Sequence, residues 1–174
     1  PDTTATEIIQ HSDNVGMIWV AERLGREKLY QYLQKFGIGS LTGIDLQGEA
    51  NPGLRSVDEW TSVDLATAGF GQGIALTPVQ MLRAVGAIAN SGRIVTPQVV
   101  DKIVGNGWEQ DISPNRGQKV ISEEASRQIT EMMVNAVEQV EAKSPKPKGF
   151  RIAGKTGTAQ IPVAGHYDSE KTIA

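Results

Sequence analysis

The spacing of apolar residues predicts a series of helices separated by turn-forming segments. Positions three or four residues apart lie on the same face of a helix, so apolar residues at those steps mark an amphipathic helix. On this basis we expect helices within residues 3–10, 15–24, 29–36, 62–69, 78–89 and 123–140. Residues 37–55 contain five glycines and one proline, which favours a long loop.

The apolar residues are arranged differently on two of these helices. Residues 15–24 are apolar on most sides, and a helix of that kind is expected to be buried. The helix that Thr77 caps and Pro78 opens has one apolar face. This face consists of Met81, Ala84, Val85 and Ile88.

Short β-like runs separate and follow the helices. They are found at Ile94 and Val95, at Val99 and Val100, and at Ile103 and Val104, and an alternating pattern runs from Phe150 into residues 154–158. Helices and strands therefore mix without the regular alternation of a βαβ protein. This arrangement favours an α+β fold in which helices pack against a sheet.

Composition narrows the class of protein. The 174 residues carry a net charge of −3, which argues against a nucleic-acid-binding surface. Cysteine is absent and histidine occurs only twice, so neither thiolate chemistry nor a histidine-rich metal site is favoured, and no cofactor is expected. No apolar stretch reaches the length of a membrane span, and no signal peptide opens the chain. From its first residue, Pro1, and its uncapped end, we expect residues 1–174 to be part of one domain cut from a larger protein.

Residues 149–156 match the pattern G-x-x-x-x-G-K-[ST] of nucleotide-binding loops. Such a loop needs an apolar strand before its first glycine and a helix after its lysine, because the helix N-terminus holds the phosphates. Prolines and lysines precede Gly149, and Gly157, Pro162 and Gly165 follow Lys155, which opposes both elements. The context disfavours nucleotide binding, although the pattern itself leaves it open.

A second interpretation places Lys155, Thr156 and Gly157 on the strand that starts at Phe150. Lys155 and Gly157 would then share one face, where the lysine supplies a cation and the glycine leaves room for a ligand along the strand. The backbone N–H of Thr158 would be available as an oxyanion donor. The simpler alternative is a lysine and two threonines on a solvated edge strand.

A polar triplet near the start of the chain offers further candidates. Ser12, Asp13 and Asn14 stand directly before a predicted helix, where Ser12 or Asn14 would ordinarily cap the helix N-terminus. However, the triplet Ser-Asp-Asn also precedes Lys-Thr-Gly along the chain. This is the order of the two motifs in the active-serine penicillin-recognising enzymes.

Further segments extend this resemblance over nearly the whole chain. They are LGREK at 24–28, KFGIG at 35–39, TGIDLQGE at 42–49, DLAT at 64–67, GFGQGIALTP at 69–78, AIANSG at 87–92 and AGKTGTA at 153–159. Together they resemble class B penicillin-binding proteins, the monofunctional peptidoglycan D,D-transpeptidases, and among them the division and sporulation type. The resemblance implies a β-lactamase/transpeptidase-like fold, with helices packed on an antiparallel sheet and incomplete at both ends.

The resemblance also implies roles for the candidate residues. The reaction would be serine acyl transfer on the D-Ala-D-Ala end of a peptidoglycan stem peptide, which β-lactam antibiotics mimic. Ser12 would relay a proton, and Lys155 would lie against the Ser12 hydroxyl and stabilise negative charge. Substrate binding would fall to Asn14, Thr156, Gly157 and Thr158.

One departure from the family pattern concerns the nucleophile. No serine of the chain is followed by a lysine three residues later, so the S-x-x-K serine of the family is expected upstream of Pro1 and the 174 residues alone are expected to be inactive.

The intact protein would be anchored on the extracytoplasmic face of a bacterial membrane by an N-terminal segment and would work with division or elongation machinery. Two alternatives of the same fold stay open, a serine β-lactamase and a β-lactam sensor or inactive scaffold.

Overall fold

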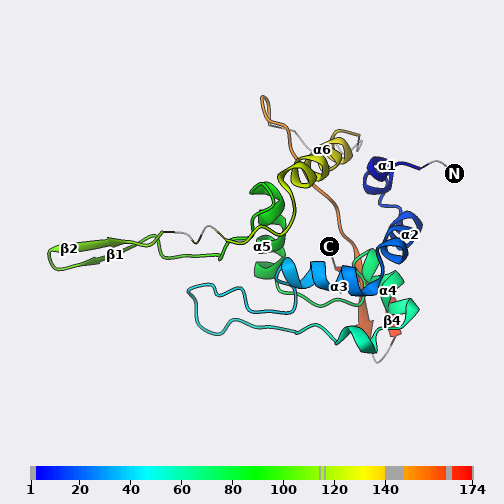
Figure 1. The fold of residues 1–174 in the computed structure, drawn as a ribbon, viewed down its shortest axis with the longest axis horizontal. Coiled ribbons are helices and arrows are strands. Elements are labelled where there is room, and N and C mark those ends of the chain that lie inside the picture. Colours follow the sequence, from blue (N-terminus) through cyan, green and yellow to red (C-terminus); the bar gives the residue numbers. More distant parts are fainter. Residues whose placement is uncertain (1–2, 114, 116, 140–146, 164–165, 174) are drawn as a thin grey trace. The chain divides into compact units, whose positions relative to one another are not determined.

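The computed structural model describes residues 3–113, 115, 117–139, 147–163 and 166–173 (Figure 1). Side chains are described as far as Ala159. The chain forms two compact units. The first comprises residues 1–26, 57–74 and 128–174, and the second comprises residues 27–56 and 75–127. Within the described ranges, none of the helices has the length and hydrophobicity that a membrane crossing requires.

Helices α1 (Ala5–Gln10), α2 (Asn14–Leu24) and α4 (Ser62–Gly69) form the N-terminal part of the first unit. Helices α2 and α4 pack closely because Gly69 has no side chain, and a Cβ at that position would lie 2.7 Å from the Cβ of Ala21. A 3₁₀ turn (Val57–Glu59) precedes α4 and leads into Trp60, which is buried. The backbone oxygen of Trp60 accepts a hydrogen bond from Arg26 at 3.2 Å.

Side-chain caps explain where several helices begin. Thr4 and Glu7 form a capping box at α1, in which the Thr4 hydroxyl accepts from the Glu7 N–H and the Glu7 carboxylate accepts from the Thr4 N–H. Helix α6 (Glu123–Gln139) begins behind Ser122, as predicted, and the Ser122 hydroxyl accepts from the Ala125 N–H at 3.0 Å. Val140, which the predicted helix included, lies outside the described residues.

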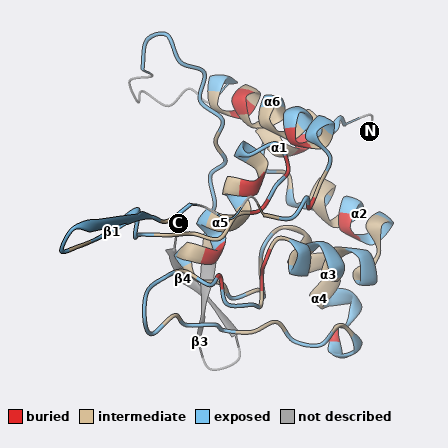
Figure 2. Ribbon diagram, turned by 60° about the vertical axis from the view of Figure 1, so that its left-hand side comes forward, coloured by how far each residue is buried: buried red, intermediate tan, exposed pale blue. Residues whose placement is uncertain are grey.

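Helix α2 is not the buried helix that its apolar sequence predicts. Ala21 is buried, but the side chains of Val15 and Trp19 are 76% and 58% exposed. Figure 2 shows α2 mostly in the colours of exposed and intermediate residues. A helix that is apolar on most sides can bury only those sides that meet a neighbour, and Ala21 lies on the side that meets α4. Trp19 instead stacks under the guanidinium of Arg23, 5.3 Å from the ring centroid.

The second unit is built around a small core of Ala87, Ile94 and Val120, against which Phe36 and Ile121 pack. Ala87 comes from helix α5 (Pro78–Ala89), and Phe36 directly follows helix α3 (Arg26–Lys35). Three segments that are far apart in the sequence therefore meet in this core. Their meeting is what makes the second unit a compact body.

The apolar stripe of α5 is partly exposed. Gln80 is fully buried, whereas Met81 and Val85 are 49% and 43% exposed. The Gln80 amide nitrogen donates to the backbone oxygen of Ser40 at 2.8 Å, and its amide oxygen accepts from the Thr77 N–H at 2.8 Å. A polar side chain with such partners can be buried, and Gln80 and Ala87 are the buried residues of α5.

Two antiparallel hairpins contain the strands of the described residues. In the second unit, β1 (Lys102–Gly105) pairs with β2 (Trp108–Asp111), with Lys102 opposite Asp111. In the first unit, β3 (Ala159–Val163) pairs with β4 (His166–Ile173), and the register shifts between Gln160 and Pro162. A proline cannot donate a ladder hydrogen bond, which accounts for an irregularity at this point.

Several predicted strands are wrong in place or extent. The run at Ile103 and Val104 is a strand, but residues 94–95 and 99–100 are not. Residues 150–158 also carry no strand, and β3 begins only at Ala159. A strand needs a paired neighbour, whereas this segment makes a backbone contact with helix α6, where the Gly154 N–H donates to the Met133 oxygen at 3.4 Å.

Candidate active site

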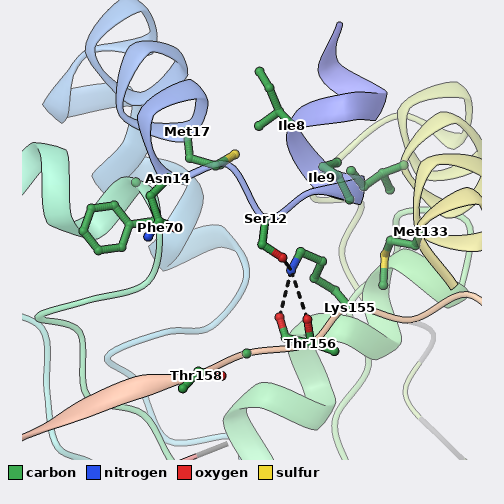
Figure 3. A pocket seen from close by; sticks show the side chains of 13 residues that line it. Ile8, Ile9, Ser12, Asn14, Met17, Phe70, Met133, Lys155, Thr156 and Thr158 are labelled. Carbon is green, nitrogen blue, oxygen red and sulfur yellow. Dashed lines mark hydrogen bonds between the residues drawn. The ribbon is translucent and has the colours of Figure 1, made fainter. Parts of the chain in front are cut away.

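A pocket of about 450 Å³ lies within the first unit. Its lining comes from α1, α2, the C-terminal end of α4, α6 and the segment that precedes β3. Figure 3 shows this segment passing below Ser12, with the side chain of Lys155 directed toward the serine. The structure brings every candidate residue of the sequence analysis to this one pocket, namely Ser12, Asn14, Lys155, Thr156, Gly157 and Thr158.

Lys155 joins the two motifs directly. Its Nζ donates to the Ser12 hydroxyl oxygen at 2.5 Å, to the backbone oxygen of Thr156 at 2.9 Å and to the Thr156 hydroxyl at 3.5 Å (Figure 3). An ammonium group has only donors, so the Ser12 oxygen accepts in this contact and keeps its own proton available for another partner. A serine beside a fixed cation is suited to passing a proton to a group in the pocket.

Ser12 has a backbone conformation that is unusual for a residue with a side chain, with φ at 52°. Its N–H donates to the Ile9 oxygen at 3.3 Å, and the Asp13 N–H donates to the Ile8 oxygen at 3.0 Å. These two bonds form a Schellman motif at the end of α1, with Ser12 at the left-handed position that glycine usually occupies. A non-glycine residue in this conformation carries roughly 1–3 kcal/mol of strain. Because the turn itself favours glycine, the reason for a serine here lies in its hydroxyl.

The helix-cap alternative for Ser12 and Asn14 is wrong. The residue that caps α2 is Asp13, whose carboxylate accepts from the Val15 N–H at 3.0 Å. Ser12 lies before the cap, and Asn14 is the first residue of the helix. Ser12 and Asn14, which flank Asp13 in the sequence, both line the pocket instead.

Helix α6 holds the segment that carries Lys155. The Arg151 guanidinium contacts the Glu131 carboxylate through two nitrogens, at 3.2 and 2.9 Å. The hydrogen bonds and the charge of Glu131 raise the pKa of Arg151, so the guanidinium stays charged in this contact. Gly154 lies so close to α6 that a Cβ would be 3.1 Å from Val137.

Gly157 leaves open space at the pocket. A Cβ at this position would meet no atom within 4 Å, and the backbone of Gly157 is not in the left-handed region. The conformation therefore does not require glycine. The missing side chain leaves the backbone between Thr156 and Thr158 accessible. A ligand lying along residues 155–158, as the sequence analysis expects, needs this access.

The nucleotide-binding interpretation of Lys155 is wrong. Residues 155–158 are not helical, and the next element is β3. The motif therefore lacks the helix N-terminus that would hold phosphates. Among the residues that the structure describes, no three His, Asp or Glu side chains are placed to hold a metal ion.

Sequence reasoning missed the apolar part of the pocket. Its members are Ile8, Ile9, Met17, Phe70, Ile129 and Met133. The helical periodicity did identify apolar positions on α1 and α6, but an apolar helix face normally indicates core. Whether an apolar helix face lines a pocket or packs in the core depends on what lies opposite it in space, and a single sequence does not show this.

The family description "Penicillin binding protein transpeptidase domain" matches residues 1–173. The chain therefore belongs to the family of penicillin-binding protein transpeptidase domains. The chain is 39% identical over 167 residues to Stage V sporulation protein D of Bacillus subtilis (strain 168). The aligned region covers 94% of this chain and 26% of that relative. It is 31% identical over 173 residues to the peptidoglycan D,D-transpeptidase FtsI homolog of Mesostigma viride, covering 89% of this chain and 29% of that relative. The chain thus spans less than a third of the length of these relatives.

Solved structures agree with this assignment. Penicillin binding protein 3 from Mycobacterium tuberculosis, complexed with aztreonam, matches with a TM-score of 0.82 at 30% identity, over 96% of this chain and 40% of that one. The predicted β-lactamase/transpeptidase-like fold and the resemblance to class B penicillin-binding proteins are therefore confirmed.

Proposed function

We propose that the complete protein is a peptidoglycan D,D-transpeptidase and that the pocket of Ser12 and Lys155 is part of its acyl-transfer site. The observation that supports this most strongly is the hydrogen bond from Lys155 to the Ser12 hydroxyl, 2.5 Å long, because it joins two motifs 143 residues apart. The names of the relatives, which include a sporulation protein and a D,D-transpeptidase, support the same activity. The aztreonam complex of a structural relative supports β-lactam binding.

The reaction begins with a serine that the 174 residues do not contain. In this proposal an S-x-x-K segment of the complete protein supplies the nucleophile, which attacks the carbonyl carbon of the penultimate D-alanine. The nucleophile gives up its proton as it attacks, the bond to the terminal D-alanine breaks, and the leaving nitrogen takes a proton that Ser12 passes on. An amine of a second stem peptide then attacks the acyl-enzyme carbonyl to form the crosslink, and the proton that the amine loses returns to the departing serine. Lys155 keeps the Ser12 oxygen in place and stabilises negative charge during both steps.

The remaining candidates bind the substrate. Asn14 holds the amide of the stem peptide, and the hydroxyls of Thr156 and Thr158 bind its terminal carboxylate. The Thr158 N–H contributes an oxyanion donor, and removal of one such donor typically raises a barrier by about 3 kcal/mol. Gly157 leaves the backbone between the two threonines accessible.

The substrate determines where the protein works. Peptidoglycan lies outside the cytoplasmic membrane, so the complete protein acts on the extracytoplasmic face, held there by an N-terminal anchor. Its partners are stem peptides, β-lactams, and the division or elongation machinery. Neither nucleic acid nor a cofactor takes part.

Labelling with a fluorescent penicillin tests this function. The complete protein should become covalently labelled, whereas the 174-residue chain and a complete protein with the S-x-x-K serine replaced by alanine should not. Failure of the complete protein to label, or labelling of the 174-residue chain, would overturn the proposal. Rapid release of the bound penicillin would identify a β-lactamase instead, and stable labelling without crosslinking of stem peptides would identify a sensor.

A further inference from the structure

We propose that Gly16 is a positioning residue for the Ser12 hydroxyl. The inference rests on the proposed function of the Ser12 and Lys155 site. Gly16 lies in the first turn of α2 and is not among the residues that line the pocket. It acts through the turn between α1 and α2, which carries Ser12.

A side chain at position 16 would contact both ends of that turn. A Cβ built on Gly16 would lie 2.7 Å from Cγ1 of Ile8 and 2.9 Å from Oδ2 of Asp13. Carbon atoms in favourable contact are separated by about 3.5–4.0 Å. Even an alanine at position 16 therefore requires Ile8, Asp13 or the whole of α1 to move.

Both neighbours are tied to the turn. Ile8 is buried and β-branched, which restricts its side chain on a helix, and its backbone oxygen accepts from the Asp13 N–H. The Asp13 carboxylate holds the Val15 N–H as the cap of α2. A shift of Ile8 or Asp13 thus disturbs one of the contacts that flank Ser12 and hold it in the left-handed conformation.

The helix gives no other reason for a glycine at this position. Glycine is less favourable than alanine inside a helix, and Gly16 does not have the positive φ that would require it. Gly86 in α5 is a matched control, because it also lies inside a helix and a Cβ there would meet no atom within 4 Å. The two glycines differ in their surroundings and not in their backbone.

The first test compares Gly16→Ala with Gly86→Ala in the complete protein. Gly16→Ala should slow acylation by a fluorescent penicillin on the order of 100-fold, the effect expected when a reacting group is misplaced by about 1 Å. Gly86→Ala should leave the rate within about twofold. In an Ile8→Ala background, which removes the carbon that the added methyl group meets first, Gly16→Ala should slow acylation far less than in the wild type. Equal rates for wild type and Gly16→Ala, or no relief in the Ile8→Ala background, would overturn the inference.

The second test does not depend on acylation. The NMR resonance of the Lys155 side chain, assigned by its loss in Lys155→Arg, reports the contact with Ser12. Gly16→Ala should shift this resonance in the same direction as Ser12→Ala does, and Gly86→Ala should leave it in place. An unmoved resonance in Gly16→Ala overturns the inference even if the complete protein is a transpeptidase. A shifted resonance in a protein that never labels with penicillin would support the positioning role and overturn the proposed function.

Discussion

Arg151 and Glu131 form a two-bond ion pair that fastens the segment before Lys155 to helix α6, with nitrogen–oxygen distances of 3.2 and 2.9 Å. Glu138, on the same helix, lies 3.7 Å from the Arg151 guanidinium. Helix α6 also contributes Met133 to the wall of the pocket. The position of Lys155 is therefore tied to α6 on one side and to Ser12 on the other.

Reversing the charge of Arg151 should weaken this attachment. We expect Arg151→Glu to slow penicillin acylation of the complete protein by about threefold, a small effect because exposed ion pairs contribute little. Combining it with Glu131→Arg should recover most of the rate, since the pair is restored with its charges exchanged. If the double variant acylates more slowly than Arg151→Glu alone, the ion pair does not position Lys155.

Ser12 allows stability and activity to be separated. Ser12→Gly and Ser12→Ala both remove the hydroxyl, so each should slow acylation by about 100-fold or more, the range typical of a lost proton-transfer group. Their stabilities should differ, because glycine relieves the left-handed strain at φ 52° and alanine keeps it. Chemical denaturation should show Ser12→Gly to be the more stable of the two by about 1 kcal/mol.

This comparison carries its own control, since the two variants lack the same hydrogen bond to Lys155. If acylation stays near the wild-type rate in both, Ser12 is a structural residue of the turn. If alanine is as stable as glycine at position 12, the turn does not carry the strain that its φ indicates.

Gly157 offers a substitution that changes access to the pocket and little else. Gly157→Ala adds a methyl group where no atom lies within 4 Å, and its backbone does not require glycine, so the midpoint of thermal unfolding should stay the same. A ligand that lies along residues 155–158 would meet this methyl group. We expect acylation to fall by about tenfold, in line with a modest steric conflict in a binding site. An unchanged acylation rate would place the ligand away from Gly157.

Acid should loosen a loop contact in the second unit. The Asp45 carboxylate accepts from the Val99 N–H at 2.7 Å and from the Val100 N–H at 2.8 Å. The hydrogen bonds from Val100 and then Val99 lower the pKa of Asp45, because they favour its charged form. A lowered pKa in the folded state means that the contact stabilises the fold fully above the ordinary aspartate pKa of about 3.9 and loses this effect as the pH falls through the folded value.

Hydrogen exchange can detect this loss at the two amides. The protection factors of the Val99 and Val100 N–H groups, corrected for intrinsic exchange, should be constant above about pH 5 and should decrease at lower pH. Asp45→Asn removes the titrating group, so protection should be lower at neutral pH and should change little with acid. Protection that falls with acid to the same extent in both proteins would assign the effect to another group.

The sequence predicted the helices better than the strands, for a physical reason. Capping residues such as Thr77 and Ser122 act within a few positions, so the starts of α5 and α6 follow from local chemistry. Residues 150–158 alternate like a strand, but a strand depends on a partner that local sequence does not specify, and this segment contacts α6 instead. The candidate residues, which the structure places in one pocket, could be selected from the sequence because their motifs are short and ordered along the chain. The left-handed turn at Ser12 and the cap at Asp13 were not foreseen, since both depend on how α1 ends and α2 begins.

A crystal structure of the complete protein acylated by a penicillin tests the central claim most directly. We predict that the antibiotic lies along residues 155–158, with its carboxylate at the hydroxyls of Thr156 and Thr158 and its amide near Asn14. Ser12 should remain hydrogen-bonded to Lys155, as it is at 2.5 Å here. An antibiotic bound to a serine elsewhere, with this pocket empty, would contradict the account.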